Sequence, residues 1–240
     1  MNDYFIRLEK LFGPAAETLR DRTVLVAGLG GVGSFAVQAL ARSPIGRLII
    51  IDKDDIEPSN LNRQLVARVD TVGKGKAEVT REDILKVSPE CEVIAMERFY
   101  DSSMDNELIE LKPDYILDCI DSVDSKKDLI RFAIDNDIPI ISSMGMARKQ
   151  DPSRLEITEL EKTSYDPIAK ILRTWKRKNR IRNRITVVSS TEPPQKMEAG
   201  SPLPSGIFVP GSAGLLMASR CVQDLLEKAA EKPETGAENE

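Results

Sequence analysis

The residues TVLVAGLGGVGS, at positions 23–34, place a short apolar run directly before a glycine-rich turn, and this combination restricts the fold strongly. The run 23–28 predicts a buried strand, residues 31–42 have the pattern of a helix, and RLIIID at 47–52 predicts a second strand. A strand, a glycine turn, a helix and a strand in this order form a βαβ unit. Such a unit has parallel strands and a right-handed crossover.

Strands and helices continue to alternate along the chain. Helices are predicted at 76–87 and 125–137, and strands at 92–99, 114–121 and 138–143. This alternation indicates a parallel sheet covered by helices on both faces. The expected fold class is therefore α/β, with a Rossmann-like, doubly wound, mostly parallel sheet to which C-terminal strands and helices are added.

The pattern changes after Ser143. Strands are predicted at 154–160 and 184–190, and between them a helix at 166–180 begins with an Asp–Pro capping signal. The first of these strands alternates apolar and polar residues, as an exposed strand does. This part of the chain is therefore expected to extend the sheet rather than to repeat the βαβ unit.

The end of the chain consists of a loop, a helix and a tail. Residues 191–206 hold four prolines and two glycines and predict a mobile lid or crossover loop over the site. Residues 212–230 predict an amphipathic closing helix. We expect a single ATP-binding domain, 1–230, made of an N-terminal helical segment, a nucleotide-binding core and a substrate-side extension, and then a disordered tail: 1–22, 23–145, 146–230 and 231–240.

Composition excludes several classes of protein. The 240 residues carry a formal net charge of −5 and include no histidine. A general nucleic-acid binder is therefore not expected, and proton transfer has to use carboxylates, Lys, Tyr, water or the substrate itself. Cys91, Cys119 and Cys221 lie far apart without a CxxC pair, which predicts no zinc site and a reducing cytoplasm. The sequence predicts neither a signal segment nor a membrane span.

The glycine-rich turn has the features of a nucleotide site. Gly28, Gly30, Gly31 and Gly33 leave bare backbone N–H groups at the start of a helix, where the helix dipole favours phosphate. Asp52, at the end of the second predicted strand, is placed to hold ribose hydroxyls. The glycine spacing alone serves NAD, FAD and ATP alike, and a tight turn without a ligand is the alternative.

The stretch after the second strand favours a triphosphate over NAD. It holds a run of polar side chains and then a lysine behind a glycine pair: Asn60, Asn62, Arg63, Gln64 and Lys76. Arg63 can place its guanidinium fork on phosphate oxygens, and Lys76 adds a compact positive charge. Asp121 ends the predicted strand 114–121 at the carboxyl edge of the sheet, where a carboxylate suits a Mg²⁺ that bridges to phosphates.

Four motifs, GLGGVGS, DKDDIEPSNLNRQ, VGKGKAE and LDCIDSVDSK, resemble those of the ubiquitin-activating-like superfamily of ATP-dependent adenylating enzymes. Bacterial members activate the C-terminal carboxylates of small sulfur-carrier proteins. Within the superfamily, IDSVDSK, DPSRLEITELEKTSYDPIAKILR and the lack of zinc cysteines are most similar to the tRNA threonylcarbamoyladenosine dehydratase branch. The superfamily motifs cover residues 1 to about 145, and the branch resemblance extends to about residue 175.

The resemblance implies ATP and Mg²⁺ as cofactors and a role for individual residues. Gly31 would meet the phosphates, Asp52 the ribose, and Lys76 the negative charge that develops during transfer. Asp121 would hold the Mg²⁺. The whole set implied to contact ATP is Gly28, Gly30, Gly31, Gly33, Asp52, Asp54, Ser59, Asn60, Asn62, Arg63, Gln64, Lys76, Asp121 and Ser122.

The resemblance also implies a homodimer. In the superfamily an N-terminal arginine reaches into the site of the partner subunit, and YFIRLEKLFG places Arg7 at that position. The implied catalytic set is Arg7, Arg63, Lys76 and Asp121. The plainer alternatives are a surface ion pair for Arg7 and a turn cap for Ser59.

Adenylation asks for positioning and charge rather than a covalent nucleophile, because a carboxylate of the substrate attacks the α-phosphate while pyrophosphate leaves. In the dehydratase branch the carboxylate belongs to the threonylcarbamoyl group on an adenosine next to the tRNA anticodon. A nitrogen or oxygen of the same modification then attacks, a ring closes and AMP leaves. An enzyme thiol is unnecessary, and we expect Cys119, placed within the fourth strand, and Cys221, within the last helix, to pack in the core.

The segment KILRTWKRKNRIRNR, at 170–184, carries eight cations without an acid in a chain that is acidic overall. A solvated helix face usually mixes both signs, so the segment predicts an anionic partner. RNA backbone fits, and Trp175 could stack on an unpaired base. The predicted tRNA-binding residues are Arg173, Trp175, Lys176, Arg177, Lys178, Arg180, Arg182 and Arg184. A surface helix with its tryptophan tucked into the core is the alternative.

Three other functions stay open at this stage. Adenylation of the C-terminus of a ubiquitin-like sulfur-carrier protein would also suit the motifs, and an acidic carrier would suit the basic segment. An NAD oxidoreductase leaves Arg63 and Lys76 without a role. A non-catalytic nucleotide-binding protein is the third. Met144 and Met146, in a stretch that is richer in glycine in close relatives, are expected to narrow the substrate entrance.

Overall fold

The structure is a computed structural model that describes residues 3–198 and 200–230. Within these residues seven strands form one sheet in the order β3-β2-β1-β4-β5-β7-β6. The strands are β1 (Thr23–Ala27), β2 (Arg47–Ile51), β3 (Glu92–Met96), β4 (Tyr115–Asp118), β5 (Ile140–Ser143), β6 (Leu155–Glu159) and β7 (Thr186–Ser190). Every neighbouring pair is parallel except β6 and β7, which are antiparallel.

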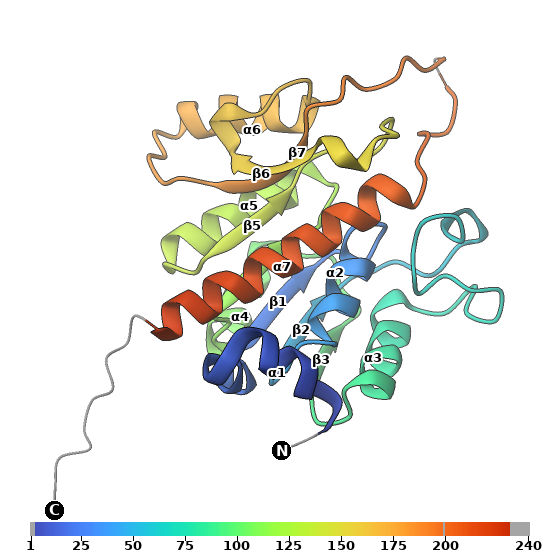
Figure 1. The fold of residues 1–240 in the computed structure, drawn as a ribbon. Coiled ribbons are helices and arrows are strands. Elements are labelled where there is room, and N and C mark those ends of the chain that lie inside the picture. Colours follow the sequence, from blue (N-terminus) through green and yellow to red (C-terminus); the bar gives the residue numbers. More distant parts are fainter. Residues whose placement is uncertain (1–2, 199, 231–240) are drawn as a thin grey trace, which may run out of the picture.

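Helices cover both faces of this sheet (Figure 1). They are α1 (Ile6–Phe12), α2 (Gly33–Leu40), α3 (Lys76–Val87), α4 (Asp105–Leu111), α5 (Val123–Asp135), α6 (Pro167–Lys178) and α7 (Phe208–Ala230). The long helix α7 crosses the sheet diagonally and packs most closely against α2. The fold class predicted from the sequence, a doubly wound α/β sheet with added C-terminal elements, is confirmed.

Alternate residues of β1 show why the fold has two apolar layers. Val24 and Val26 belong to the core beneath α2 and α7. Leu25 and Ala27 belong to a second core that includes Leu108 of α4 together with residues of α5. Successive side chains of a strand point to opposite faces, so a strand buried on both sides is apolar throughout. These two layers hold the carboxyl ends of the parallel strands level along one edge of the sheet.

Several boundaries differ from the prediction. The third strand ends at Met96 rather than at residue 99, because β2, its partner in the sheet, already ends at Ile51. The fourth ends at Asp118 rather than at residue 121, so the placement of Cys119 inside that strand was wrong. Helix α4 had no counterpart in the prediction, and the predicted tail 231–240 lies outside the described residues.

The last helix begins at Phe208 rather than at residue 212. Pro210 is the third residue of the helix, within the first turn, where a missing N–H leaves no helical hydrogen bond unmade. None of the helices in the described ranges is both long enough and apolar enough to cross a membrane.

Two glycines of the turn after β1 are required by the backbone itself. Gly28 has a φ of +87°, and a Cβ there would also lie 2.7 Å from the carbonyl oxygen of Cys119. A Cβ on Gly33 would lie 1.8 Å from the carbonyl oxygen of Gly28. The turn can therefore bring helix α2 against the end of β1 only with glycine at both positions.

Candidate active site

A cavity of about 810 Å³ opens at the carboxyl ends of the parallel strands. Its lining comes from the segments that follow β1 to β5 and from the start of α7. The structure brings most of the predicted nucleotide-binding residues to this one cavity: Gly28, Gly30, Gly31, Asp52, Asp54, Asn60, Arg63, Gln64, Lys76 and Asp121. Residues that are up to about ninety positions apart in the chain thus meet because the strands that precede them are neighbours in the sheet.

Gly31 faces the interior of this cavity. A Cβ at Gly31 would lie 3.3 Å from Cβ of Pro210 and 3.6 Å from Cγ of Arg63, and all three residues line the cavity. A larger side chain would therefore fill the space between the glycine turn and the start of α7.

The Asp52 carboxylate lies directly beside the glycine turn. It accepts a hydrogen bond of 2.6 Å from the N–H of Leu29 and one of 2.9 Å from the N–H of Asp54. Burial raises the pKa of Asp52, and these two N–H groups together with the charge of Lys76 oppose that rise. Each oxygen keeps a free lone pair, so the carboxylate can still accept from ligand hydroxyls.

Lys76 reaches the cavity because the chain doubles back before α3. Asp55 and Gly75 form an antiparallel bridge, and the N–H of Lys76 donates to the carbonyl of Asp54 at 2.9 Å. The side chain of Lys76 is only 7% exposed, and its Nζ lies 3.1 Å from Oδ2 of Asp54. This pair holds the ammonium group in place at the cavity wall, where an arriving phosphate would compete with Asp54 for it.

The polar run after β2 forms a short helical turn whose residues hold one another. Glu57 and Asn60 make a reciprocal capping box, and Asn60 is buried. Nη1 of Arg63 donates to the carbonyl of Ser59 at 2.7 Å and to Oδ1 of Asn62 at 2.9 Å. Gln64 is buried, and its Oε1 has no partner among the described residues. An unpaired buried acceptor at a cavity is the kind of group that a bound ligand or water satisfies.

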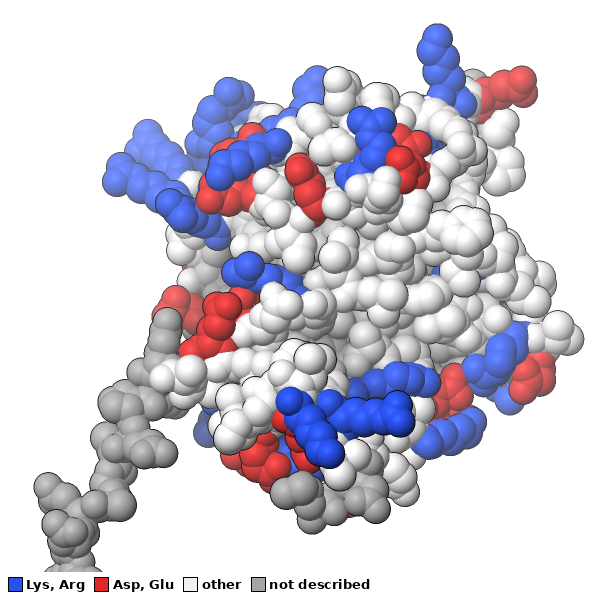
Figure 2. All heavy atoms as spheres, viewed as in Figure 1, with Lys and Arg blue, Asp and Glu red and all other residues white. Residues whose placement is uncertain are grey.

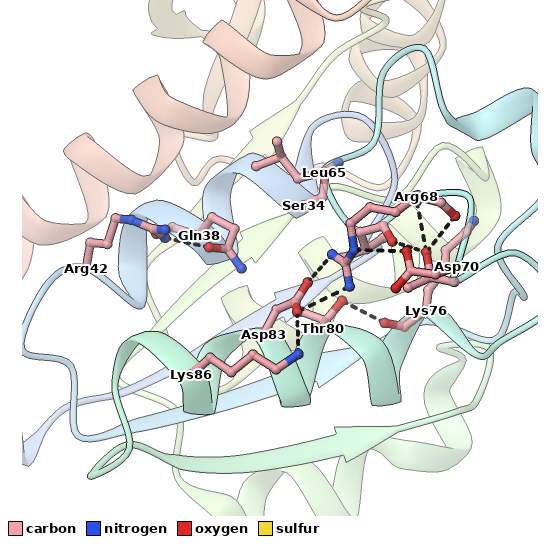
Figure 3. Close-up of polar contacts among 12 residues, drawn as sticks. Ser34, Gln38, Arg42, Leu65, Arg68, Asp70, Lys76, Thr80, Asp83 and Lys86 are labelled. Atoms are coloured by element: carbon pink, nitrogen blue, oxygen red, sulfur yellow. Dashed lines mark hydrogen bonds and ion pairs between the residues drawn. The ribbon is translucent and has the colours of Figure 1, made fainter.

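A network outside the cavity fixes this segment to α3 (Figure 3). Nη1 of Arg68 lies 2.6 Å from Oδ2 of Asp83, and Lys86 contacts the other oxygen of the same carboxylate at 3.3 Å. The hydroxyl of Thr71 donates to the carbonyl of Val66 at 2.7 Å and accepts from the N–H of Arg68 at 2.8 Å. Arg68 therefore ties its own part of the segment, five residues beyond Arg63, to α3, and it does not line the cavity itself.

Asp121 lies three residues beyond β4, on a short segment whose start contacts a buried ion pair, Asp118 with Lys126. Asp118 accepts from the N–H of Ile120 at 3.2 Å, and its other oxygen pairs with Nζ of Lys126 at 2.8 Å. Ser142 donates to the same oxygen at 2.6 Å. This buried group was not predicted from the sequence, and it fixes the start of the 119–121 segment that ends in Asp121.

The residues fit a metal ion only in combination with a ligand. Among the described residues no three His, Cys, Asp or Glu side chains converge as a metal site. The Asp121 carboxylate is exposed to the cavity and forms no ion pair with the described residues. One carboxylate together with substrate phosphates is the usual protein environment of Mg²⁺.

Some predicted contact residues do not reach the cavity surface. Gly33 is buried at the start of α2, and Ser122 immediately precedes α5. Ser59 donates to the carboxylate of Glu57 at 3.2 Å, as a turn cap does. Asn62 donates to the carbonyl of Ser205 at 2.9 Å and so ties the predicted lid loop to the site. These residues support the site from outside its lining.

Arg7 lies outside the cavity of its own chain. It is exposed on α1, it does not line the cavity, and within the described residues it makes no ion pair or hydrogen bond. A role for Arg7 at the site of its own subunit is therefore not supported by its position.

One wall of the cavity was not predicted from the sequence. Arg98, Phe99 and Tyr100 line it just beyond the end of β3, in a stretch that was predicted to belong partly to the strand. Nζ of Lys53 lies 4.8 Å from the centre of the Phe99 ring. The signal that could have found this wall is the position of the segment after a predicted parallel strand, at the edge where ligands bind.

The basic segment lies away from the cavity, on and beyond α6. Figure 2 shows a group of cationic side chains near the end of this helix, and Lys170, Arg177, Lys178, Arg180 and Arg182 are exposed. Arg184 is also exposed, and its Nη1 lies 3.8 Å from Glu159. None of the residues of the segment lines the cavity.

Three of the predicted tRNA contacts are engaged inside the protein. Lys176 is buried and paired with Glu161, and Arg173 donates to the carbonyl of Thr163 at 3.1 Å. Trp175 is half-buried and packs against the core, with the guanidinium of Arg131 5.6 Å from its ring centre. This position of Trp175 resembles the alternative of a tryptophan tucked against the core, and stacking of its ring on a base stays a prediction.

The chain matches a known family over almost its whole length. The sequence model of the ThiF family matches residues 5–235 of this chain. The chain belongs to the ThiF family. The resemblance to ubiquitin-activating-like adenylating enzymes that the four motifs indicated is thereby confirmed.

Named relatives place this ThiF-family chain more narrowly. It is 42% identical over 227 residues to the tRNA threonylcarbamoyladenosine dehydratase of Bacillus subtilis, covering 88% of this chain and 89% of that protein. The Escherichia coli tRNA N6-threonylcarbamoyladenosine dehydratase TcdA, solved in complex with ATP, is similar in structure with a TM-score of 0.88. In that comparison, 33% of residues are identical, and 95% of this chain and 96% of that chain are covered. The molybdopterin-synthase adenylyltransferase of Escherichia coli is 34% identical over 132 residues, which is 54% of this chain and 52% of that protein.

Proposed function

We propose that this ThiF-family protein catalyses the ATP-dependent dehydration of threonylcarbamoyladenosine in tRNA near the anticodon. The threonyl carboxylate is adenylated with release of pyrophosphate, the modification closes into a ring, and AMP leaves. The observation that carries the proposal is the convergence of Asp52, Arg63, Lys76 and Asp121 on one cavity in a chain that is similar over its length to named dehydratases. The convergent groups suit a nucleoside triphosphate, and the relatives supply the class of substrate.

Each group has a role that follows from its position. Asp52 would accept from the ribose hydroxyls beside the glycine turn. Arg63 and Lys76 would hold the phosphates and stabilise the charge on the departing pyrophosphate. A Mg²⁺ held by Asp121 and the phosphates would neutralise further charge at the triphosphate. The chemistry asks the chain for positioning and electrostatic stabilisation and for no covalent bond to the enzyme.

The thiols of the described chain are unsuited to covalent transfer. Burial raises the pKa of Cys91 to about 11, and it also raises the pKa of the Cys119 and Cys221 thiols. A protonated thiol is a poor nucleophile. Among these three, only Cys119 lines the cavity.

Replacement of Cys221 should separate stability from activity. Because Cys221 packs in α7 away from the cavity, we expect Cys221→Ala to cost about 1 kcal/mol of stability and to leave the cyclisation rate unchanged. Thermal unfolding and product formation measured on the same preparation would check this. A folded but inactive Cys221→Ala protein would indicate that the thiol takes part in transfer.

A homodimer would complete the site. Figure 2 shows a broad surface without charged side chains over the start of α2 and the first half of α7, where Phe208 is 71% exposed and Leu215 51% exposed. Leu65, next to α2, is 38% exposed. A second copy of the chain on this surface would cover these side chains and could bring Arg7 to the cavity of its partner.

The exposed cations at the end of α6 would meet the phosphate backbone of the tRNA. We expect the quadruple variant Arg177→Gln, Lys178→Gln, Arg180→Gln and Arg182→Gln to weaken tRNA binding. The slope of log affinity against log salt should fall by about 0.7–0.9 for each lost phosphate contact. Filter binding at several salt concentrations measures this slope.

The matched control is Lys86→Gln, a lysine on α3 that pairs with Asp83 away from α6. The control should keep the wild-type slope, and the quadruple variant should keep its ATP affinity. An unchanged slope in the quadruple variant would place tRNA elsewhere. A tRNA substrate also agrees with the cytoplasmic location expected from the cysteine content.

The direct test uses purified protein, ATP, Mg²⁺ and tRNA that carries threonylcarbamoyladenosine. Nucleosides are then analysed by mass spectrometry. The proposal expects the modified nucleoside to lose the mass of one water, in amounts that match the AMP formed. The competing function is adenylation of a sulfur-carrier protein. It is favoured by the similarity to molybdopterin-synthase adenylyltransferase, which covers 54% of this chain. Carrier-dependent pyrophosphate exchange without any change in the nucleoside would support that alternative.

A further inference from the structure

A wall with two methionines lines the same cavity as the predicted nucleotide-binding residues. The segment 143–147, which follows β5, lines the cavity, and Met144 and Met146 are buried with exposures of 3% and 6%. Gly145 lies between them, so its position decides where both methionines lie. The N–H of Met144 donates to the carbonyl of Val188 at 2.9 Å, which fixes the first residue of the wall to the neighbouring strand β7.

Two buried charges hold both polar groups of the Gly145 backbone. Its N–H donates to Oδ2 of Asp166 at 2.9 Å, and its carbonyl accepts from Nζ of Lys149 at 2.7 Å. Lys149 and Asp166 also form an ion pair of 3.3 Å, and each of the two side chains is only 1% exposed. A Cβ at Gly145 would lie 3.1 Å from Oδ2 of Asp166, so glycine allows this close approach.

The same carboxylate ties the wall to α6. Oδ1 of Asp166 accepts from the N–H of Ala169 at 2.9 Å and thereby caps the helix. Ile168, on the first turn of that helix, lines the cavity as well. One carboxylate thus holds the methionine wall and the start of α6 in a single arrangement.

A buried ion pair is a costly means of adding stability, because removing two charges from water offsets most of their attraction. Here, apart from their contact with each other, the side chains of Lys149 and Asp166 bind the backbone of Gly145 and the first turn of α6. The arrangement makes more sense as a means of fixing geometry than as a source of stability. What it fixes is the part of the cavity surface that segment 143–147 and Ile168 form.

We propose that Lys149 and Asp166 are positioning residues that hold the methionine wall against the activated carboxylate and keep water from it. The inference rests on the proposed function, because it concerns the fate of the acyl adenylate. In cyclisation, a nitrogen or oxygen of the modification attacks the acyl carbon, and the bond from that carbon to the AMP oxygen breaks. In the competing reaction a water molecule attacks the same carbon, AMP leaves, and the original carboxylate returns with one oxygen from water.

The test is the number of AMP molecules formed for each cyclised nucleoside. The wild-type protein is expected to form about one AMP per product. In Lys149→Met the wall is no longer held, so we expect the ratio to rise roughly threefold or more through hydrolysis. The reaction is run in water enriched in heavy oxygen, and the recovered uncyclised nucleoside should then carry heavy oxygen in its carboxylate. A change of stability alone would not produce this label.

Two further variants make the test specific. Asp166→Ser keeps a helix-capping hydroxyl but loses the carboxylate oxygen that holds Gly145, and it should give the same rise in the ratio. Lys162→Met is the matched control, because Lys162 is exposed, pairs with Glu159 and does not touch the wall. The control should keep the wild-type ratio, and all variants should keep their affinity for ATP.

The outcomes separate the two proposals. If the wild-type protein cyclises the nucleoside while Lys149→Met and Asp166→Ser both keep its ratio of AMP to product, the positioning role is wrong and the proposed function stands. If the wild-type protein forms no cyclised nucleoside, the proposed function fails and this inference fails with it.

Discussion

Arg63→Ala is expected to lower the rate of adenylate formation by about 10²–10³-fold, because loss of one preorganised group that stabilises transition-state charge costs about that much. Asp121→Asn should have a similar effect if its carboxylate holds the Mg²⁺. Arg63→Lys should recover only part of the activity, since lysine keeps the charge but lacks the guanidinium fork. Pyrophosphate exchange in the presence of the modified tRNA measures this step without the later ring closure.

Arg68→Ala is the matched control for Arg63→Ala. Arg68 lies in the same segment and pairs with Asp83 of α3 at 2.6 Å (Figure 3), but it is not among the residues that line the cavity. Its side chain is 40% exposed, so its loss should cost only about 0.5 kcal/mol of stability. A loss of exchange in Arg68→Ala as large as in Arg63→Ala would mean that the segment acts through its folding, and the proposed role of Arg63 would be wrong.

Mixing two inactive variants should restore activity if Arg7 acts in the site of the partner subunit. Arg7→Ala alone is expected to lose about 10³-fold in rate, as expected for an arginine that stabilises transition-state charge. Asp121→Asn is inactive for its own reason. After equal amounts are mixed and exchange subunits, half of the dimers are mixed, and one of the two sites in each is intact. About a quarter of the wild-type activity should therefore return.

The mixing experiment has a clear contrary result. If Arg7 acts within its own subunit, a mixed dimer contains no intact site, and activity stays at the level of the separate variants. Arg63→Ala mixed with Asp121→Asn serves as the control, because both residues line the cavity of a single chain. That pair should not complement, whatever Arg7 does.

The order of the elements could be predicted from the sequence because buried parallel strands are apolar throughout and are separated by helical patterns. Ends of elements were less accurate. The strand prediction for 92–99 followed local alternation, whereas β3 ends at Met96 because its pairing partner β2 ends there. Helix α4 has seven residues and a single buried position, Leu108, which is too short a pattern to be recognised.

The predicted nucleotide-binding residues could be found because they come from the glycine turn, from the stretch 52–76 and from the end of the predicted strand 114–121. The remaining walls depend on tertiary structure. Arg98 and Phe99 were placed inside a strand predicted too long, and Pro210 reaches the cavity only because α7 crosses the sheet (Figure 1). The hydrogen bond from Gly145 to Asp166 joins residues twenty-one positions apart, and no local sequence pattern indicates it.

The basic segment shows how a charge pattern can mislead. Residues 170–184 contain no acid. Even so, Lys176 pairs with Glu161 and Arg184 lies near Glu159, and both glutamates precede the segment in the chain. Leu172 and Trp175 share the inner side of α6 with Lys176 at helical spacing, so that side packs inward. Only the cations on the outer side of the helix and beyond its end remain for a nucleic acid.

The central claim is that the threonyl carboxylate attacks the α-phosphate of ATP. It can be followed directly with modified tRNA whose threonyl carboxylate carries heavy oxygen in both positions. One carboxylate oxygen forms the bond to phosphorus and stays there when the ring closes. We therefore expect AMP with one heavy oxygen for each cyclised nucleoside. Unlabelled AMP, or formation of ADP and phosphate in its place, would contradict it.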